Sequence, residues 1–190
     1  MILDRYRFAL NLLWGICTKP DVTLSYESLL NAFHAKNVFK HFVLPLAELL
    51  FVVTFLASLI YLEGNVAIVI VKSLFDFLSF VVGYGASCLL VKWLTLRYFI
   101  DSMEERNVYI LVAVLMSVIF VVNIAQIVFP NLFFVRFFYV YIFYLVWVMS
   151  EGVVDIAEEN RNKYMCFVSI LVIVVPFIIG SLLKQMVPNI

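Results

Sequence analysis

Five long apolar runs, each of about twenty residues or more, recur along this chain of 190 residues. A helix needs about 20 apolar residues to cross the hydrocarbon core of a bilayer, so each run is a candidate transmembrane helix. The runs are continuous and do not alternate in polarity, which disfavours a membrane β-barrel. The sequence therefore predicts an all-α integral membrane bundle of five transmembrane helices, at 42–62, 66–98, 107–129, 132–150 and 164–187.

Composition supports the same class of protein. Hydrophobic residues make up 65% of the chain, charged residues only 14%, and the mean hydropathy is +1.08, values that a soluble globular domain does not reach. The 13 basic residues balance the 13 acidic ones, so there is no basic surplus to bind phosphates and no nucleic-acid partner is expected. The turns at 63–65 and 130–131 are short, which makes the helices that they join antiparallel neighbours.

Lysine and arginine divide unequally between the two sides of the predicted bundle. With five spans, the two termini lie on opposite sides of the membrane. Cytoplasmic loops carry an excess of basic residues, so we predict a cytoplasmic N-terminus and an external C-terminus, in the cell (inner) membrane. This orientation leaves only Lys72, Arg136 and Lys184 on the far side. The cytoplasmic side then receives Arg5, Arg7, Lys19, Lys36, Lys40, Lys92, Arg97, Arg106, Arg161 and Lys163.

Residues 1–41 are predicted to form a cytoplasmic, interfacial amphipathic segment ahead of a transmembrane domain over 42–190. The run Ile2–Ile16 is too short to span a bilayer. Its apolar positions approximate one face, so we expect a helix in the membrane plane with Trp14 at headgroup depth. Ser25 is a suitable N-cap for a second short helix. The apolar stripe of that helix recurs at helical spacing, at Tyr26, Leu29, Leu30 and Phe33.

The second run carries charged residues at membrane depth. Lys72 and Asp76 are four residues apart, on one helix face, and can pair there. Ionisable side chains in a membrane are functional candidates, so one interpretation is a polar pathway or binding cavity that Arg136 completes. The alternative is an ion pair that neutralises itself and fixes helix register. Small residues continue the same face, which should point into the bundle because they let another helix approach closely: Ser79, Gly83 and Ser87.

Two further polar features lie in the predicted spans. Glu48 is about one turn inside the cytoplasmic boundary of the first span, just after Pro45. Its carboxylate would carry a proton or hold a cation; the alternatives are that it snorkels, is protonated, or pairs with a cation such as Lys92. Asn123 and Gln126, three residues apart in the third span, are predicted to make interhelical hydrogen bonds.

Glu151, Asp155, Glu158 and Glu159 follow the fourth span at spacings that place them on one helix face. We interpret them as a solvated cytoplasmic face that a partner can reach. A divalent cation is the alternative, although one helix face supplies too few oxygens for a hard cation. We expect no bound metal and no cofactor. The sequence contains no nucleophile with a base and no phosphate-binding glycine loop, so it predicts a protein that is not an enzyme.

A polar N-terminal segment is followed by five predicted helices, with a proline early in the first helix and another in the last. This order resembles the Yip1 family of multi-spanning membrane proteins, in particular its short bacterial members. The stretches that carry the resemblance are Thr18–Pro20, Lys36–Ala47, Glu158–Met165 and Val175–Ile179. The resemblance implies five membrane helices and a cytoplasmic N-terminus. Eukaryotic relatives bind small GTPases of the Rab type, and many carry an Asp-Leu-Tyr-Gly-Pro motif. That motif is not present before the first span here, so Rab binding is not carried over.

Two functions from different classes follow. The first is a non-enzymatic adaptor or membrane-organising scaffold, whose cytoplasmic face binds another membrane or membrane-associated protein, or a second copy of the chain. The second is a small transporter or channel that uses Lys72, Asp76 and Arg136. A water-filled cavity through the bundle would favour the transporter, and a dry, closed bundle would favour the adaptor.

Overall fold

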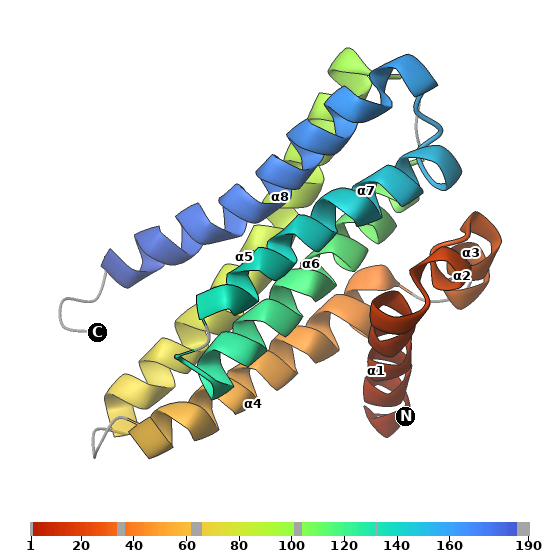
Figure 1. Cartoon of the computed structure of the whole chain (residues 1–190). Helices are drawn as coiled ribbons and strands as arrows, with labels where there is room; N and C mark the ends of the chain where they lie inside the picture. The colour runs from red at the N-terminus through yellow and green to blue at the C-terminus, as the bar shows by residue number, and fades with distance from the viewer. Residues whose placement is uncertain (1, 34–36, 62–65, 101–103, 132, 186–190) are drawn as a thin grey trace.

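The computed structural model describes the chain except residues 1, 34–36, 62–65, 101–103, 132 and 186–190, and no strand occurs in the part that it describes (Figure 1). The α-helices are α1 (Ile2–Thr18), α2 (Pro20–Thr23), α3 (Tyr26–Phe33), α4 (Leu44–Tyr61), α5 (Val66–Tyr98), α6 (Glu105–Val128), α7 (Val140–Gly152) and α8 (Glu158–Gln185). A π-helical turn, η1 (Phe39–Val43), precedes α4, and a 3₁₀ segment, η2 (Phe133–Tyr139), precedes α7.

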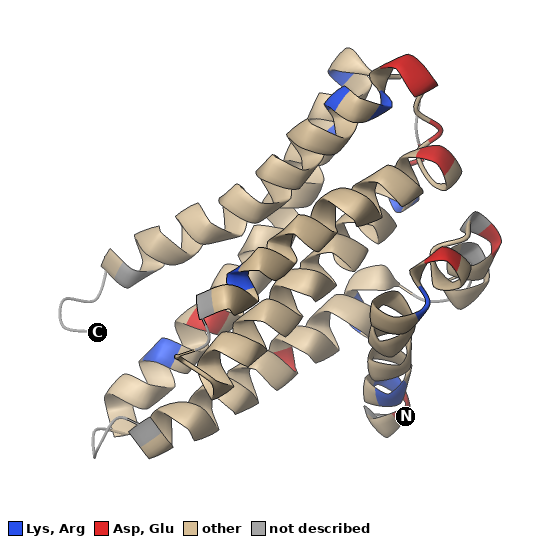
Figure 2. Cartoon of the chain, in the orientation of Figure 1, with Lys and Arg blue, Asp and Glu red and all other residues tan. Residues whose placement is uncertain are grey.

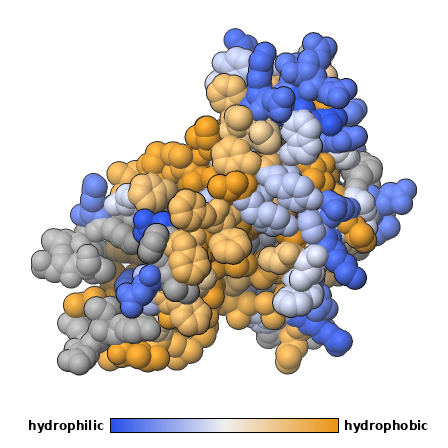
Figure 3. All heavy atoms as spheres, in the orientation of Figure 1, coloured by the Kyte–Doolittle hydropathy of each residue, from blue (hydrophilic) through white to orange (hydrophobic). Residues whose placement is uncertain are grey.

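Five helical stretches in the described residues are long and apolar enough to cross a membrane, which confirms the predicted all-α class and the number of candidate spans. They run side by side as an elongated bundle, with apolar residues over most of the visible face of the shaft (Figures 1 and 3). Charged residues gather mainly at one end, around the α7–α8 connection and the N-terminal helices (Figure 2). A membrane-spanning bundle requires this distribution, because lipid cannot solvate charge.

Helix α6 is the core of the bundle. Every residue from Ile110 to Phe120 is buried, and all of them except Ser117 are hydrophobic. A helix that is apolar on all sides has no polar face to turn toward water, so it is surrounded by its neighbours. Helices α4, α5, α7 and α8 all contact it.

The second span agrees with the predicted range 66–98, whereas the other four begin or end at different residues from those expected. The first starts earlier, at the η1 turn, where the Leu44 amide bonds the Phe39 carbonyl. Pro45 follows directly; it has no N–H to bond the carbonyl four residues back, and a wider turn accommodates that loss. The fourth span is not one α-helix, since η2 forms its first part. Helix α8 begins at Glu158, six residues before the expected start at 164.

Helices α5 and α8 pack as an antiparallel pair in a regular register. The Ser79 hydroxyl donates to the Pro176 carbonyl at 3.2 Å, and the Thr95 hydroxyl donates to the Tyr164 hydroxyl at 3.3 Å. A Cβ on Gly83 would lie only 3.0 Å from Pro176 Cβ. Two members of the predicted small-residue stripe, Ser79 and Gly83, therefore face α8, which the sequence interpretation had not named as their partner, and the third, Ser87, is fully buried.

The N-terminal helices pack against one end of the bundle (Figure 1). Helix α1 contacts η1 and α4 and buries Ala9 and Ile16. Part of the face that we expected on the membrane thus faces protein instead, while Leu3, Leu10 and Trp14 are exposed on another side of α1. Helix α3 buries Leu29 and Phe33. The placement of these helices in the membrane plane remains a prediction.

Candidate functional site

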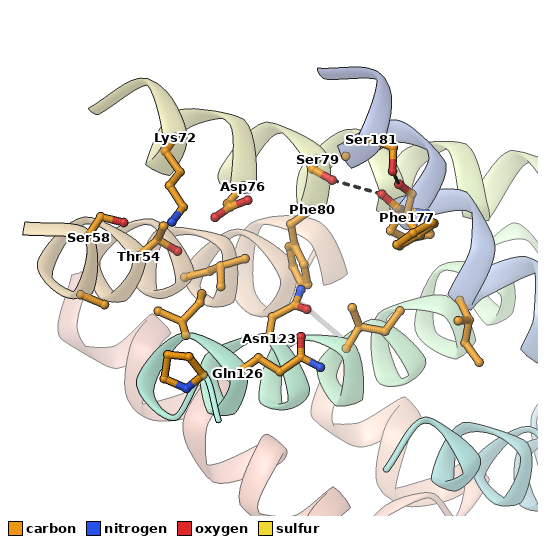
Figure 4. Close-up of a pocket in the computed structure, with 18 of the residues that line it drawn as sticks. Thr54, Ser58, Lys72, Asp76, Ser79, Phe80, Asn123, Gln126, Phe177 and Ser181 are labelled. Carbon is orange, nitrogen blue, oxygen red and sulfur yellow. Dashed lines mark hydrogen bonds between the residues drawn. The ribbon is translucent and has the colours of Figure 1, made fainter. Parts of the chain in front are cut away.

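A pocket of about 500 Å³ lies between four of the spanning helices, α4, α5, α6 and α8, and reaches η2 (Figure 4). Each of the four helices contributes both polar and apolar residues to the lining. The polar lining consists of Thr54, Ser58, Lys72, Asp76, Ser79, Asn123, Gln126, Tyr139 and Ser181. The remaining lining consists of Leu50, Ala57, Phe80, Ile119, Ile127, Pro130, Ile173, Pro176, Phe177 and Gly180.

Helix α5 supplies the two charged groups. Lys72 and Asp76 are one helical turn apart, are half-buried, and both point into the pocket (Figure 4). The charged residues that the sequence singled out in this helix are therefore part of the lining of a cavity. An ion pair that served only to fix helix register would not need a cavity beside it. Whether they also pair with each other remains a prediction.

Arg136 does not line the pocket, which corrects its expected place beside Lys72 and Asp76. It is exposed and lies in η2, one 3₁₀ turn before Tyr139, which does line it. The expectation treated 132–150 as a regular α-helix. A 3₁₀ segment rises about 2.0 Å per residue against about 1.5 Å in an α-helix, so the depth and the face counted for Arg136 on an α-helix do not apply.

Helix α6 adds Asn123 and Gln126, and helix α4 adds Thr54 and Ser58 (Figure 4). Two polar atoms in this set are buried without a hydrogen-bond partner: Oγ1 of Thr54, a residue that is 1% exposed, and Nε2 of Gln126. Such atoms are uncommon in folded proteins, because an unmet hydrogen bond in a dry site costs about 1–3 kcal/mol. They line a cavity in which a bound polar group can satisfy them.

The sequence interpretation missed Thr54 and Ser58. Both are small hydroxyl residues in an apolar helix, which usually bond their own backbone and carry little signal. Their four-residue spacing, equal to that of Lys72 and Asp76, was the one available indication that α4 turns a polar stripe toward α5.

The pocket is closed toward the end of the bundle where the N-terminal helices lie. Its lining stops at Leu50, Phe80, Ile119 and Ile173. Beyond this level the described helices meet in buried, mostly apolar side chains: Leu46, Val91, Leu111, Leu115, Val168 and Tyr164. Within the described residues, the lining of the pocket is therefore confined to one half of the bundle and does not continue through the other half.

Glu48 lies outside the pocket. Its carboxylate accepts a hydrogen bond of 2.5 Å from the Tyr6 hydroxyl, and this bond holds the pKa of Tyr6 above its ordinary value. Lys92, a suggested partner of Glu48, instead forms an ion pair with Glu105 at the start of α6. The Glu48–Lys92 pair, one of the alternatives that the sequence left open, is thus replaced by two other contacts, because Lys92 is near the end of α5 where α6 begins.

The acidic residues after the fourth span do not share a helix face, contrary to expectation. Helix α7 ends at Gly152, and Asp155 lies in the connection with a left-handed backbone (φ 59°), so the chain turns between Glu151 and Glu158. Glu151 pairs with Arg161 at 3.0 Å. Glu158 and Glu159 begin α8, where negative charge favours a helix N-terminus. All four acidic residues are exposed.

The described part of the chain contains no group of three or more His, Cys, Asp or Glu side chains that could hold a metal ion. Cys17, Cys88 and Cys166 are free thiols.

Comparison of the chain with protein-family models, with curated proteins and with solved structures found no match. The resemblance to the Yip1 family therefore remains a prediction.

Proposed function

We propose that this chain is a non-enzymatic multi-pass membrane protein that takes a small polar ligand into the pocket between α4, α5, α6 and α8. The observation that carries the proposal is the convergence of Lys72 and Asp76 on a cavity of about 500 Å³. A charged side chain within a membrane costs several kcal/mol, roughly 2.5–3.5 for a lysine or aspartate at a helix centre. Cavities of about 300–1,000 Å³ are typical of small-molecule sites.

The blind shape of the pocket distinguishes between modes of action. A channel requires a continuous polar path, whereas the described helices close the other half of the bundle with apolar side chains such as Leu46 and Leu115. A cavity that is closed toward one end of the bundle is the form expected of a carrier or of a ligand sensor. Of the two functions that the sequence suggested, the small transporter thus has the stronger support. The channel form of that hypothesis is not supported, and Arg136 is not part of the proposed site. The charge bias of the sequence predicts that the pocket lies on the external side.

A second candidate remains the Yip1-like adaptor or membrane-organising scaffold. It is favoured by the way in which the N-terminal helices are fixed to the bundle. Tyr6 bonds Glu48, the Tyr141 hydroxyl donates to the Ile16 carbonyl at 2.9 Å, and the Tyr144 hydroxyl donates to Asp21 at 2.6 Å. These contacts build a fixed surface at one end, and a fixed surface binds a partner at lower entropic cost than a loose arm.

The adaptor proposal predicts a defined partner, either a membrane protein or a second copy of the chain. Changing Asp155, Glu158 and Glu159 to Asn, Gln and Gln should then reduce recovery of that partner in mild detergent, because these exposed carboxylates lie at the α7–α8 connection, at the same end of the bundle as the N-terminal helices (Figure 2). Lys72→Met, at the other end of the bundle, is the matched control and should leave recovery unchanged. Equal recovery with all variants would remove the adaptor proposal.

The ligand-binding proposal is tested by the access of water to the pocket. In a background where Cys17, Cys88 and Cys166 are replaced, Asn123→Cys should react with a charged methanethiosulfonate reagent in detergent. Ser117→Cys is the control, because Ser117 is on the same helix but fully buried in the closed half. A thiol at 123 as inert as one at 117 would show that the pocket admits no polar molecule, and the proposal would fail.

A further inference from the structure

The outer face of helix α5 carries a second hollow, away from the pocket between the helices. It has a volume of about 370 Å³ and is lined by residues of α5: Leu89, Lys92, Trp93, Leu96 and Arg97. With about 3.6 residues per turn, Leu89, Trp93 and Leu96 share the centre of one helix face, and the two basic residues lie at its opposite edges. The three central residues are exposed. The hollow is therefore an apolar and aromatic strip with a cation on each side.

The length of α5 puts this hollow at the level of the lipid headgroups. The helix has 33 residues and is thus about 50 Å long, whereas the hydrocarbon core of a bilayer is about 30 Å thick. Its last turns lie at the charged end of the bundle (Figures 1 and 2), so it is there that α5 extends beyond the hydrocarbon. Exposed tryptophans gather at the boundary between hydrocarbon and headgroups. Arg97 lies one turn, about 6 Å, beyond Trp93, in the layer of the lipid phosphates.

Arg97 is the cation that remains for a phosphate in this hollow. Lys92 already pairs with Glu105, whereas Arg97 is exposed and belongs to neither of the ion pairs found between described residues, Lys92–Glu105 and Arg161–Glu151. A guanidinium can donate two parallel hydrogen bonds to one phosphate. The charge bias of the sequence predicts that this end of the bundle is cytoplasmic, and the cytoplasmic leaflet presents anionic lipids.

The same face of α5 continues into the membrane as an exposed apolar stripe. Val82, Gly85 and Leu89 follow one another at spacings of three and four residues, and all three are exposed. A Cβ on Gly85 would meet nothing within 4 Å, so the stripe is recessed by one side chain at that turn. An acyl chain that runs down from the hollow can lie in this recess, whereas a soluble phosphate has no group to place there.

We propose that the hollow binds an anionic phospholipid of the surrounding membrane. Its phosphate contacts Arg97, its glycerol backbone lies beside Trp93, and one acyl chain follows the stripe toward Gly85. A phosphate and an apolar chain on one molecule match the order of the groups along the helix. The site is separate from the pocket between α4, α5, α6 and α8, and it goes beyond the proposed function, because it does not require that pocket to bind a ligand.

The experiment measures which lipid lies beside Trp93. In the full-length protein with Trp14→Phe and Trp147→Phe, Trp93 is the one tryptophan left of the three in the chain. The protein is reconstituted in phosphatidylcholine vesicles that contain a small fraction of either brominated phosphatidylglycerol or brominated phosphatidylcholine, and bromine quenches the fluorescence of a tryptophan that it contacts. We expect the anionic lipid to bind beside Trp93 about fivefold more strongly, the ratio that corresponds to about 1 kcal/mol for one basic residue at an anionic surface.

Arg97→Gln should make the two lipids quench Trp93 equally, since it removes the cation and leaves the apolar strip. Lys163→Gln, which removes an exposed basic residue near the start of α8 at the same end of the bundle, is the matched control and should keep the fivefold preference. Equal quenching by the two lipids when Arg97 is present overturns the proposal. A preference that Lys163→Gln lowers as much as Arg97→Gln also overturns it, because the attraction would then belong to the whole charged end.

Discussion

The hydroxyl of Tyr6 in α1 donates a hydrogen bond to the carboxylate of Glu48 in α4, across 42 positions of sequence. The bond satisfies a carboxylate in the first spanning helix with a group from the N-terminal segment. Because Ala9 and Ile16 of the same helix are fully buried, α1 is fixed by both a polar and an apolar contact. The N-terminal segment is therefore part of the folded bundle.

Tyr6→Phe should loosen α1 without unfolding the protein. The change removes one hydrogen bond to a carboxylate in a half-buried position, which contributes about 1 kcal/mol, so backbone amides of α1 should exchange hydrogen about fivefold faster. Tyr98→Phe is the control, because Tyr98 is exposed at the end of α5. Unchanged exchange in α1 would show that the Tyr6 bond does not hold the helix.

The same contact should depend on pH in a defined direction. The hydrogen bond to Glu48 raises the pKa of Tyr6 in the folded protein above the ordinary value of 10.0. A raised folded-state pKa means that the stabilisation is fully present below about pH 10 and is lost as pH rises through the raised value. The difference in thermal midpoint between the natural protein and Tyr6→Phe should thus be present at pH 8 and disappear at strongly alkaline pH. A difference that grows with pH would contradict this assignment.

Gly83→Ala should disturb the α5–α8 interface. The new Cβ would lie 3.0 Å from Pro176 Cβ and 3.2 Å from its Cα, so a backbone must move, at a cost of about 1–3 kcal/mol in the free energy of unfolding. Gly85→Ala is the matched control, since nothing lies within 4 Å of its Cβ. That variant should be neutral or gain up to about 1 kcal/mol from helix propensity. Equal losses in both variants, measured by thermal unfolding in detergent, would argue against close packing at Gly83.

Asp76→Asn should lower the stability of the protein more than the double change Lys72→Met with Asp76→Leu does. The single change leaves the lysine charge uncompensated at membrane depth, which costs up to about 3–5 kcal/mol when fully buried and less here because Lys72 is half-buried. The double change removes both charges, so thermal unfolding should show that much of the loss is recovered, while ligand binding is abolished. If the double variant were less stable than Asp76→Asn, the balance of charges would not be what stabilises the pocket.

Sequence patterns predicted those features that depend on length and hydropathy. Apolar runs of about twenty residues identify the spans, because a bilayer imposes that length on any helix that crosses it. The start of α5 at Val66 and its end at Tyr98 agree with the run predicted at 66–98. Lys72 and Asp76 were identifiable because a charge in an apolar run is conspicuous.

Tertiary packing determined what the sequence did not reveal. Thr54 enters the pocket only because of the rotation of α4 against α5, and that rotation depends on side chains from several helices. Arg136 was misplaced because a 3₁₀ segment and an α-helix of the same composition look alike in sequence. The acidic face was misplaced because Asp155 has a left-handed backbone, a conformation that an aspartate adopts without an obvious sequence signal.

The central claim is that the polar pocket opens toward one side of the membrane only. It is tested most directly by labelling single cysteines in oriented vesicles with a charged reagent that does not cross the bilayer. Asn131→Cys and Asn160→Cys, at opposite ends of the bundle, report the two sides. Asn123→Cys should react only from the side that labels Asn131→Cys, and Ser117→Cys from neither side. Reaction of Asn123→Cys from the side of Asn160→Cys, or from both sides, would contradict the account.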